Sequence, residues 1–158
     1  MAIVSESLGY NKGSAAPRAE GLHKVNRYEV ELDFAAISAA RTAAGAAAIG
    51  AGDGLEALRI PAKSLVMAVG MDVVTAEGGT LTVDIGDGSD TDGWLDGVNA
   101  NTVASYCSAA ALAEGTPNTF VGYGAGKYYS AADTIDVITV NAADAAVVRV
   151  WALVADCA

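Results

Sequence analysis

The sequence has few of the residues on which most catalytic and metal sites depend. Its 158 residues include one histidine, His23, and two cysteines, Cys107 and Cys157. Zinc sites need clustered His or Cys ligands, and a nucleophilic triad needs a well-placed base. His23 lies in a segment without regular patterning, and no Gly-x-Ser-x-Gly or Walker-type motif is present. The sequence therefore predicts a protein that is not an enzyme and that holds no cofactor.

Aromatic and charged residues are also scarce, at 6% and 18% of the chain. Aspartate is frequent enough to supply paired carboxylates for glycoside hydrolysis, but few aromatics remain to build a sugar-binding platform. Alanine dominates the apolar fraction, and 18 glycines accompany it. Small side chains with few charges favour close backbone packing and buried subunit contacts. Disorder would need low hydrophobicity and high charge, so it is not predicted for the bulk of the chain.

Positive charge is in deficit, with nine Lys and Arg against 19 Asp and Glu, a net charge of −10. Phosphate binding needs clustered basic residues, so no nucleic-acid partner is expected. The stretch 65–74 is too short to cross a bilayer and contains Asp72, so no membrane association is expected either. The N-terminus has neither the basic nor the long apolar region of a signal peptide. Cys107 and Cys157 are expected to be reduced, with pairing as the alternative.

The first 27 residues mix small, polar and charged types without a sustained period. Residues 1–27 are interpreted as an extended N-terminal arm, with a frayed terminus as an equal alternative. Order begins at residue 28, where 28–34 alternates between apolar and acidic side chains. That alternation predicts a half-buried strand. The chain is thus divided into an arm, 1–27, and one domain, 28–158.

Most of the following segments read as strands. The Ala-rich stretch 35–44 predicts a short helix, which the glycines after it end. Strands are predicted at 55–60, 64–75, 80–85, 134–140 and 145–155, with one poor strand and a long loop within 98–119. Because 64–75 and 79–85 are so close, they are predicted to form an antiparallel hairpin. Gly70 is interpreted as a site for a bend or bulge in the first of these strands.

The last strand is apolar on both faces, which indicates burial on both sides. In one domain, such burial requires a loop or a second subunit. Trp151 is therefore a candidate interface anchor, because tryptophan is enriched in interface cores. The alternative is that Trp151 fills the interior of the sandwich.

One segment, 84–97, is dense in aspartate and glycine. Its acidic side chains are weak candidates for calcium ligands: Asp84, Asp87, Asp90, Asp92 and Asp96. The helix–loop–helix calcium signature does not fit, because its first and last acids are missing. The favoured interpretation of 86–97 is a turn-rich connection between strands, since turns select Asp and Gly for backbone reasons.

Short strands with Gly-rich turns predict an all-β fold, an antiparallel sandwich or jelly roll with an N-terminal arm and a short helix. Several strings then resemble a group of small structural proteins of tailed phages, including marine phages of cyanobacteria. The strings are YEVELDF (28–34), LRIPA (58–62), DIGDG (84–88), DGWLDG (92–97), YYSAADTID (128–136) and VRVWALV (148–154). The resemblance covers about residues 28–158.

The resemblance implies a β-sandwich, often trimeric, that is carried on the exterior of the virion. The expected role is a capsid decoration or cement protein, made in the host cytoplasm, whose partners are the major capsid protein and further copies of itself. None of the strings is a catalytic motif, so the resemblance assigns no functional residue. The alternative is another virion β-module, such as a head-fibre, tail or receptor- or carbohydrate-binding protein.

Overall fold

The computed structural model describes residues 3–7, 25–108, 123–124 and 126–157. Ten strands and one helix follow in chain order: β1 (Ile3–Ser7), β2 (Val25–Asp33), α1 (Phe34–Ala43), β3 (Gly54–Ile60), β4 (Ser64–Thr75), β5 (Thr82–Asp87), β6 (Asp90–Asn99), β7 (Ser105–Cys107), β8 (Lys127–Tyr129), β9 (Asp133–Thr139) and β10 (Val147–Asp156). The predicted all-β class with one short helix is confirmed. Within the described residues, no helix is long and apolar enough to cross a membrane.

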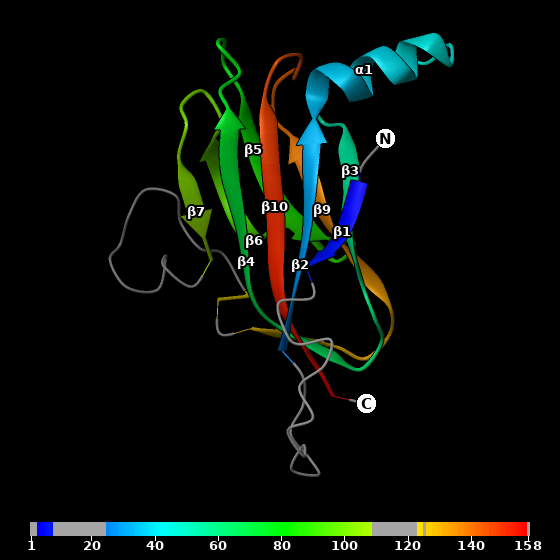
Figure 1. Ribbon diagram of the computed structural model, residues 1–158, viewed down its shortest axis with the longest axis vertical. Coiled ribbons are helices and arrows are strands. Elements are labelled where there is room, and N and C mark those ends of the chain that lie inside the picture. The colour runs from blue at the N-terminus through cyan, green and yellow to red at the C-terminus, as the bar shows by residue number, and fades with distance from the viewer. Residues whose placement is uncertain (1–2, 8–24, 109–122, 125, 158) are drawn as a thin grey trace.

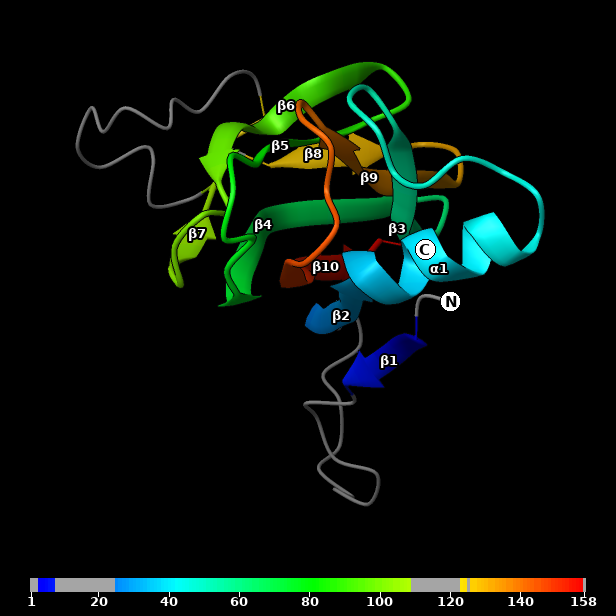
Figure 2. The ribbon, with the colours of Figure 1, turned by 90° about the horizontal axis from the view of Figure 1, so that it is seen from above.

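Two antiparallel sheets pack face to face (Figures 1 and 2). The larger has the order β1-β2-β10-β4-β7, with β8 pairing beside β7 on β4, and the smaller has the order β3-β9-β5-β6. All strand pairs are antiparallel. The last strand of the chain therefore lies in the middle of the larger sheet, between β2 and β4.

Alternating side chains place the core between the sheets, as strand periodicity requires. On β2, Val30 and Leu32 are buried, and on β10, Val148 and Val150 are buried. Trp94 of β6 is the largest fully buried side chain of the smaller sheet. The strand predicted at 28–34 is confirmed; it starts earlier, at Val25, and ends one residue sooner.

The helix predicted at 35–44 is confirmed as α1, Phe34–Ala43. Asp33 is its N-cap, and the Asp33 carboxylate accepts a hydrogen bond from the Ala36 amide at 2.9 Å. A side-chain acceptor at this position satisfies an amide that the first helical turn leaves without a partner. The chain thus passes from β2 into α1 at one end of the sandwich (Figure 1).

The hairpin predicted between 64–75 and 79–85 is wrong. β4 belongs to the larger sheet, whereas β5 belongs to the smaller and pairs with β6 and β9. The connection crosses between the sheets and is held by Glu77, whose carboxylate accepts hydrogen bonds from the amides of Asp144, Ala145 and Ala146. Proximity in sequence suggested a hairpin, but these tertiary hydrogen bonds fix a crossover.

The turn-rich connection predicted for 86–97 is also wrong. Residues 90–99 form β6, and β5 and β6 make the hairpin that the sequence assigned elsewhere. Gly86 and Gly93 lie within these strands at points of close contact. A Cβ on Gly86 would collide with the backbone of Asp90 and Thr91, and one on Gly93 would collide with the Tyr123 ring. The glycines therefore serve close approach within a sheet.

The register shifts between β4 and β10 do not lie at Gly70. The register with β10 shifts between Leu153 and Val154, where the partners change from Ala68 to Val66 and skip Met67. Gly70 itself pairs regularly with Trp151. A second shift, between Val147 and Val148, skips Val74. The bend or bulge predicted at Gly70 is therefore wrong, because the irregularities of β4 lie at Met67 and Val74.

The predicted N-terminal arm contributes a strand to the larger sheet. β1 pairs antiparallel with β2, from Ile3 opposite Glu31 to Ser7 opposite Arg27. Residues 8–24 lie outside the described residues. Of the weak region predicted at 98–119, residues 105–107 form β7, and 109–119 lie outside the described residues. Cys107 and Cys157 are both free and partly buried.

Candidate functional site

The acidic residues of the 84–97 segment divide between the two faces of the smaller sheet. Side chains alternate along a strand, so Asp84 and Asp87, three positions apart on β5, point to opposite sides. Asp87 is fully buried and faces the core, whereas Asp84 is half-buried on the outer face. Asp90, Asp92 and Asp96 lie on β6 and are each half-buried. The five calcium candidates therefore do not share one face of the sheet, because Asp87 alone among them is fully buried.

Asp87 is the centre of a polar cluster inside the sandwich. One of its carboxylate oxygens, Oδ2, pairs with the ammonium of Lys127 and accepts a hydrogen bond from the Tyr129 hydroxyl at 2.6 Å. The other oxygen, Oδ1, accepts from the amides of Ser89, at 2.9 Å, and Asp90, at 3.2 Å. We call Asp87, Lys127, Tyr123, Tyr129 and Trp94 the Asp87 cluster.

Aromatic rings enclose the lysine of the Asp87 cluster. The Lys127 ammonium lies 4.1 Å from the Tyr123 ring centroid and 5.0 Å from that of Tyr129, and it donates a hydrogen bond to the Tyr123 hydroxyl at 2.9 Å. The Trp94 indole donates to the Tyr129 hydroxyl at 3.2 Å. Cation–π contacts of this kind are favourable within about 6 Å of a ring centroid. The cluster thus joins the β5–β6 hairpin of one sheet to β8 of the other.

Burial opposes the ionisation of Asp87, but the hydrogen bonds from Lys127 and Tyr129 outweigh it, so the pKa of Asp87 lies below its usual value. Burial also acts against the charge on Lys127, yet its hydrogen bonds to Asp87 and Tyr123 raise the Lys127 pKa. Burial, reinforced by the bond to Asp87, raises the pKa of Tyr129. Near neutral pH, Asp87 therefore stays ionised, Lys127 stays protonated and Tyr129 stays neutral, so none of the three is suited to transfer a proton. The arrangement stabilises the fold.

The other calcium candidates are also engaged or separated. The Asp84 carboxylate accepts a hydrogen bond from the Gly97 amide at 2.8 Å, and burial, with the nearby charge of Asp96, raises the Asp84 pKa. Within the described residues, no group of three or more acidic, His or Cys side chains is arranged to hold a metal ion. A calcium ion at Asp87 would have to displace Lys127, because both would occupy the same carboxylate.

The cluster was missed from the sequence. Lys127, Tyr123 and Tyr129 lie some 40 residues from Asp87 in the chain. They reach Asp87 through tertiary contacts: β8 pairs with β4 in the facing sheet, and the Tyr123 amide donates a hydrogen bond to the Gly93 carbonyl of β6. The one local signal was the spacing of aromatics around a lone lysine in a segment with few charges. That signal does not identify the partner carboxylate.

Trp151 lies on the outer face of the larger sheet. Its strand neighbours Val150 and Ala152 are fully buried in the core, while Trp151 itself is half-buried. The alternative that Trp151 fills the interior is therefore wrong. A Cβ on the opposing Gly70 would collide with the indole, so the glycine provides the space that the ring occupies. The Arg27 guanidinium lies 5.2 Å from the Trp151 ring centroid.

Charged side chains surround Trp151 on the same outer face. The Arg149 guanidinium pairs with Glu31 at 2.9 Å, and Arg27 pairs with Glu29 at 3.2 Å. Four large apolar side chains on strands of the larger sheet are also exposed, Val25 at 49%, Met67 at 45%, Val74 at 42% and Tyr128 at 53%. A large aromatic ring among paired charges is the composition typical of an interface core with a polar rim.

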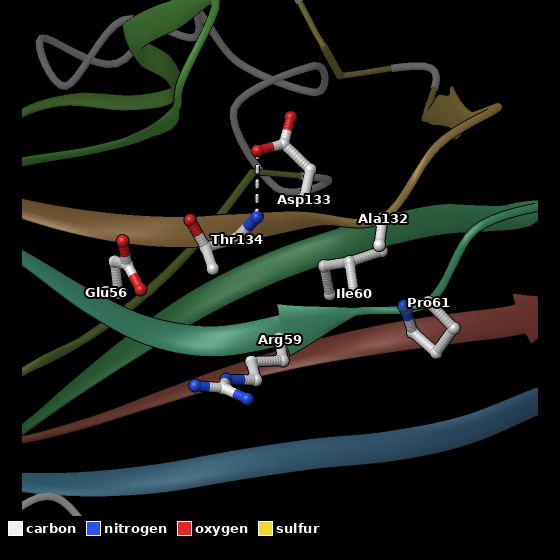
Figure 3. Close-up of a pocket in the computed structure, with 7 residues that line it drawn as sticks. All are labelled: Glu56, Arg59, Ile60, Pro61, Ala132, Asp133 and Thr134. Atoms are coloured by element: carbon white, nitrogen blue, oxygen red, sulfur yellow. Dashed lines mark hydrogen bonds between the residues drawn. The ribbon is translucent and has the colours of Figure 1, made fainter.

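A hollow of about 410 Å³ lies along β3 and β9 of the smaller sheet (Figure 3). Glu56 and Arg59 line it from β3, and Asp133 and Thr134 line it from β9. The Asp133 carboxylate accepts a hydrogen bond from the Thr134 amide at 2.9 Å. The lining mixes both charge signs and offers no set of convergent donors, so it does not define a ligand class.

No protein-family model and no curated protein matches the chain. Two solved structures do. A chain from the acidic stable capsid structure of Helicobacter pylori bacteriophage KHP30 matches with a TM-score of 0.54 and 12% identity, over 98% of this chain and 93% of that one. A chain from the capsid of Ralstonia phage GP4 matches with a TM-score of 0.52 and 14% identity, over 89% of this chain and 88% of that one.

The chain shares its fold with chains of two phage capsid structures. At 12% and 14% identity the likeness concerns the fold and assigns no residue a function. It extends over nearly the whole of each chain, so the sandwich is the common unit. The marine or cyanobacterial origin that the sequence resemblance suggested gains no support from these two phages.

Proposed function

We propose that this protein is a non-enzymatic structural component of a phage virion that binds the outer surface of the capsid and stabilises it. Its partners are the major capsid protein and further copies of itself, with a trimer as the expected assembly. The observation that carries the proposal is the fold shared with two phage capsid structures over about nine-tenths or more of this chain. A decoration or cement protein acts through several interfaces at once, and multivalent contact requires surfaces in place of a pocket.

The chemistry of the described residues agrees with a structural role. The most elaborate polar cluster, around Asp87, is buried and locked in one protonation state. The hollow beside β3 mixes both charge signs in its lining and does not define a ligand class. A net charge of −10 suits an exterior position, because an acidic protein is repelled by packaged nucleic acid.

The outer face of the larger sheet offers a surface for the assembly. The Trp151 indole lies over Gly70, beside the ion pairs of Arg27 and Arg149. We assign Trp151 the role of an interface anchor, since tryptophan is prominent among residues that dominate binding energy. Its strand is central in the sheet, so the anchor is presented on a rigid element.

The test is the mass of the purified chain in solution, alone and after mixing with empty capsid shells that lack it. A homo-oligomer that co-sediments with the shells supports the proposal. A monomer that does not bind the shells would contradict it and would favour a receptor- or carbohydrate-binding module.

Substitution of Trp151 by alanine then tests the surface. The variant should stay folded but lose oligomerisation or shell binding by at least tenfold, as expected for an interface anchor. Val103→Ala is the matched control, because it truncates an apolar side chain that is 71% exposed outside the sheet. Unchanged assembly of W151A would remove Trp151 from the interface without affecting the capsid-binding proposal.

A further inference from the structure

The strand β1 occupies the edge of the larger sheet, where it pairs with β2 and, of the described strands, with no other. The register is continuous over five residues, from Ile3 opposite Glu31 to Ser7 opposite Arg27. An antiparallel ladder of this length depends on backbone groups alone. The β2 edge therefore presents the same donors and acceptors to any strand of suitable length.

β1 lies outside the body of the sandwich. Within the described residues, the strand of the smaller sheet nearest to β2 is β3, and β1 projects beyond it (Figure 2). β2, by contrast, buries Val30 and Leu32 in the core. Detaching β1 from β2 thus breaks one backbone ladder at the edge of the sheet, and elements at such an edge are among the first to separate by local opening.

The connection between β1 and β2 is far longer than their pairing requires. Adjacent antiparallel strands can be joined by about two residues, whereas seventeen residues, 8–24, separate Ser7 from Val25. A chain of that length can span at most about 60 Å. It can therefore reach the β2 edge of a neighbouring molecule as well as its own.

We propose that Ile3–Ser7 is an exchanged strand, which pairs with β2 of a second copy of this chain in the register seen here. For two elements joined by a short linker, the effective concentration for intrachain pairing is on the order of millimolar. Pairing between two copies therefore competes with pairing inside one chain once the protein concentration reaches about 1 mM, or when two copies are held side by side. Identical pairing with the element of another copy is the basis of domain swapping. The inference is independent of the proposed function, since it concerns only contacts between copies.

A disulfide trap tests the exchange. Ser5 lies opposite Glu29, and directly opposed antiparallel residues have Cα atoms about 4.5–5.5 Å apart, within the range that a disulfide spans. In full-length chains with both native cysteines replaced by serine, Ser5→Cys is made in one chain and Glu29→Cys in another. The two variants are mixed, incubated in a thiol–disulfide buffer, and analysed by non-reducing mass measurement and peptide mapping.

At about 1 mM the expected result is a covalent heterodimer joined through the two introduced thiols, with a yield that falls at least tenfold at 10 µM. The control mixes Ser5→Cys with Glu56→Cys, whose position is exposed on β3 of the other sheet. A heterodimer yield no higher than this control would overturn the proposal. A single chain that carries both S5C and E29C should form an internal disulfide at 10 µM. If it does not, Ser5 does not lie opposite Glu29, and the β1–β2 register on which the proposal depends is wrong.

Discussion

Replacing Lys127 with methionine should destabilise the protein by about 3 kcal/mol, because it leaves the Asp87 carboxylate buried without its positive partner. The Asp87 side chain is fully buried, whereas the Lys127 side chain is 21% exposed to solvent. The estimate therefore takes the lower end of the range for a broken buried ion pair, since water can enter where the ammonium was. For a chain of this length the loss corresponds to a fall in melting temperature of roughly 6–12 °C.

The assay is urea denaturation, with the midpoint compared at constant slope. Lys63→Met is the matched control, because Lys63 is exposed and pairs with no carboxylate among the described residues. Its effect should stay within about 0.5 kcal/mol. The double variant D87N/K127M should be more stable than K127M by about 1 kcal/mol or more, because it no longer buries the Asp87 carboxylate without a positive partner.

The dependence on pH follows from the direction of the Asp87 shift. In the native protein the Asp87 pKa is lowered, so its contribution to stability is present above the unfolded value of about 3.9 and is lost as the pH falls below it. Without Lys127, burial should raise the Asp87 pKa, so protonation relieves the penalty. The deficit of K127M should therefore be largest near pH 7 and shrink toward pH 5. A deficit below about 0.5 kcal/mol at pH 7, or one equal at both pH values, would refute the reasoning.

Three further variants test other features. Glu77→Gln should cost about 1–3 kcal/mol at pH 7, because the Glu77 carboxylate accepts three backbone hydrogen bonds and an amide offers one acceptor oxygen in place of two. Burial opposes its ionisation but these bonds prevail and lower the Glu77 pKa, so the deficit in denaturation midpoint should shrink as the pH falls below the ordinary glutamate value of about 4.3. Gly70→Ala should displace the Trp151 indole and cost about 1–3 kcal/mol; an unchanged tryptophan near-ultraviolet circular dichroism signal would contradict this. Replacing Cys107 and Cys157 together with serine should leave the melting temperature nearly unchanged, since both thiols are free; a loss of several kcal/mol would instead indicate a disulfide.

Residue patterning alone located most strands. The alternation of 28–34 follows from one buried and one exposed face, and β2 realises it with Val30 and Leu32 in the core. The strand 64–75 was placed with the bounds that the structure has, because its apolar stretch is long and its ends are marked by Pro61 and the glycines after Thr75. The helix at 34–43 followed from alanine propensity.

The segment 84–97 shows where a prediction from local sequence alone fails. Aspartate and glycine in 84–97 have the composition of a turn, since both residues tolerate turn backbone. In the structure they form two paired strands, because Gly86 and Gly93 allow backbone and ring atoms to approach closely. Asp87 is a core residue for a tertiary reason, namely a lysine and a tyrosine hydroxyl from β8.

The sequence by itself determined the all-β class, the alternating core positions and the scarcity of catalytic residues, because each depends on composition or on a period of two along the chain. Only the tertiary structure decided which strands pair, since pairing depends on contacts between distant segments. It separated β4 from β5, joined Asp87 to Lys127, and turned Trp151 outward over Gly70. The physical reason is common to all three, because a local pattern fixes which face of a strand is buried but not which neighbour covers it.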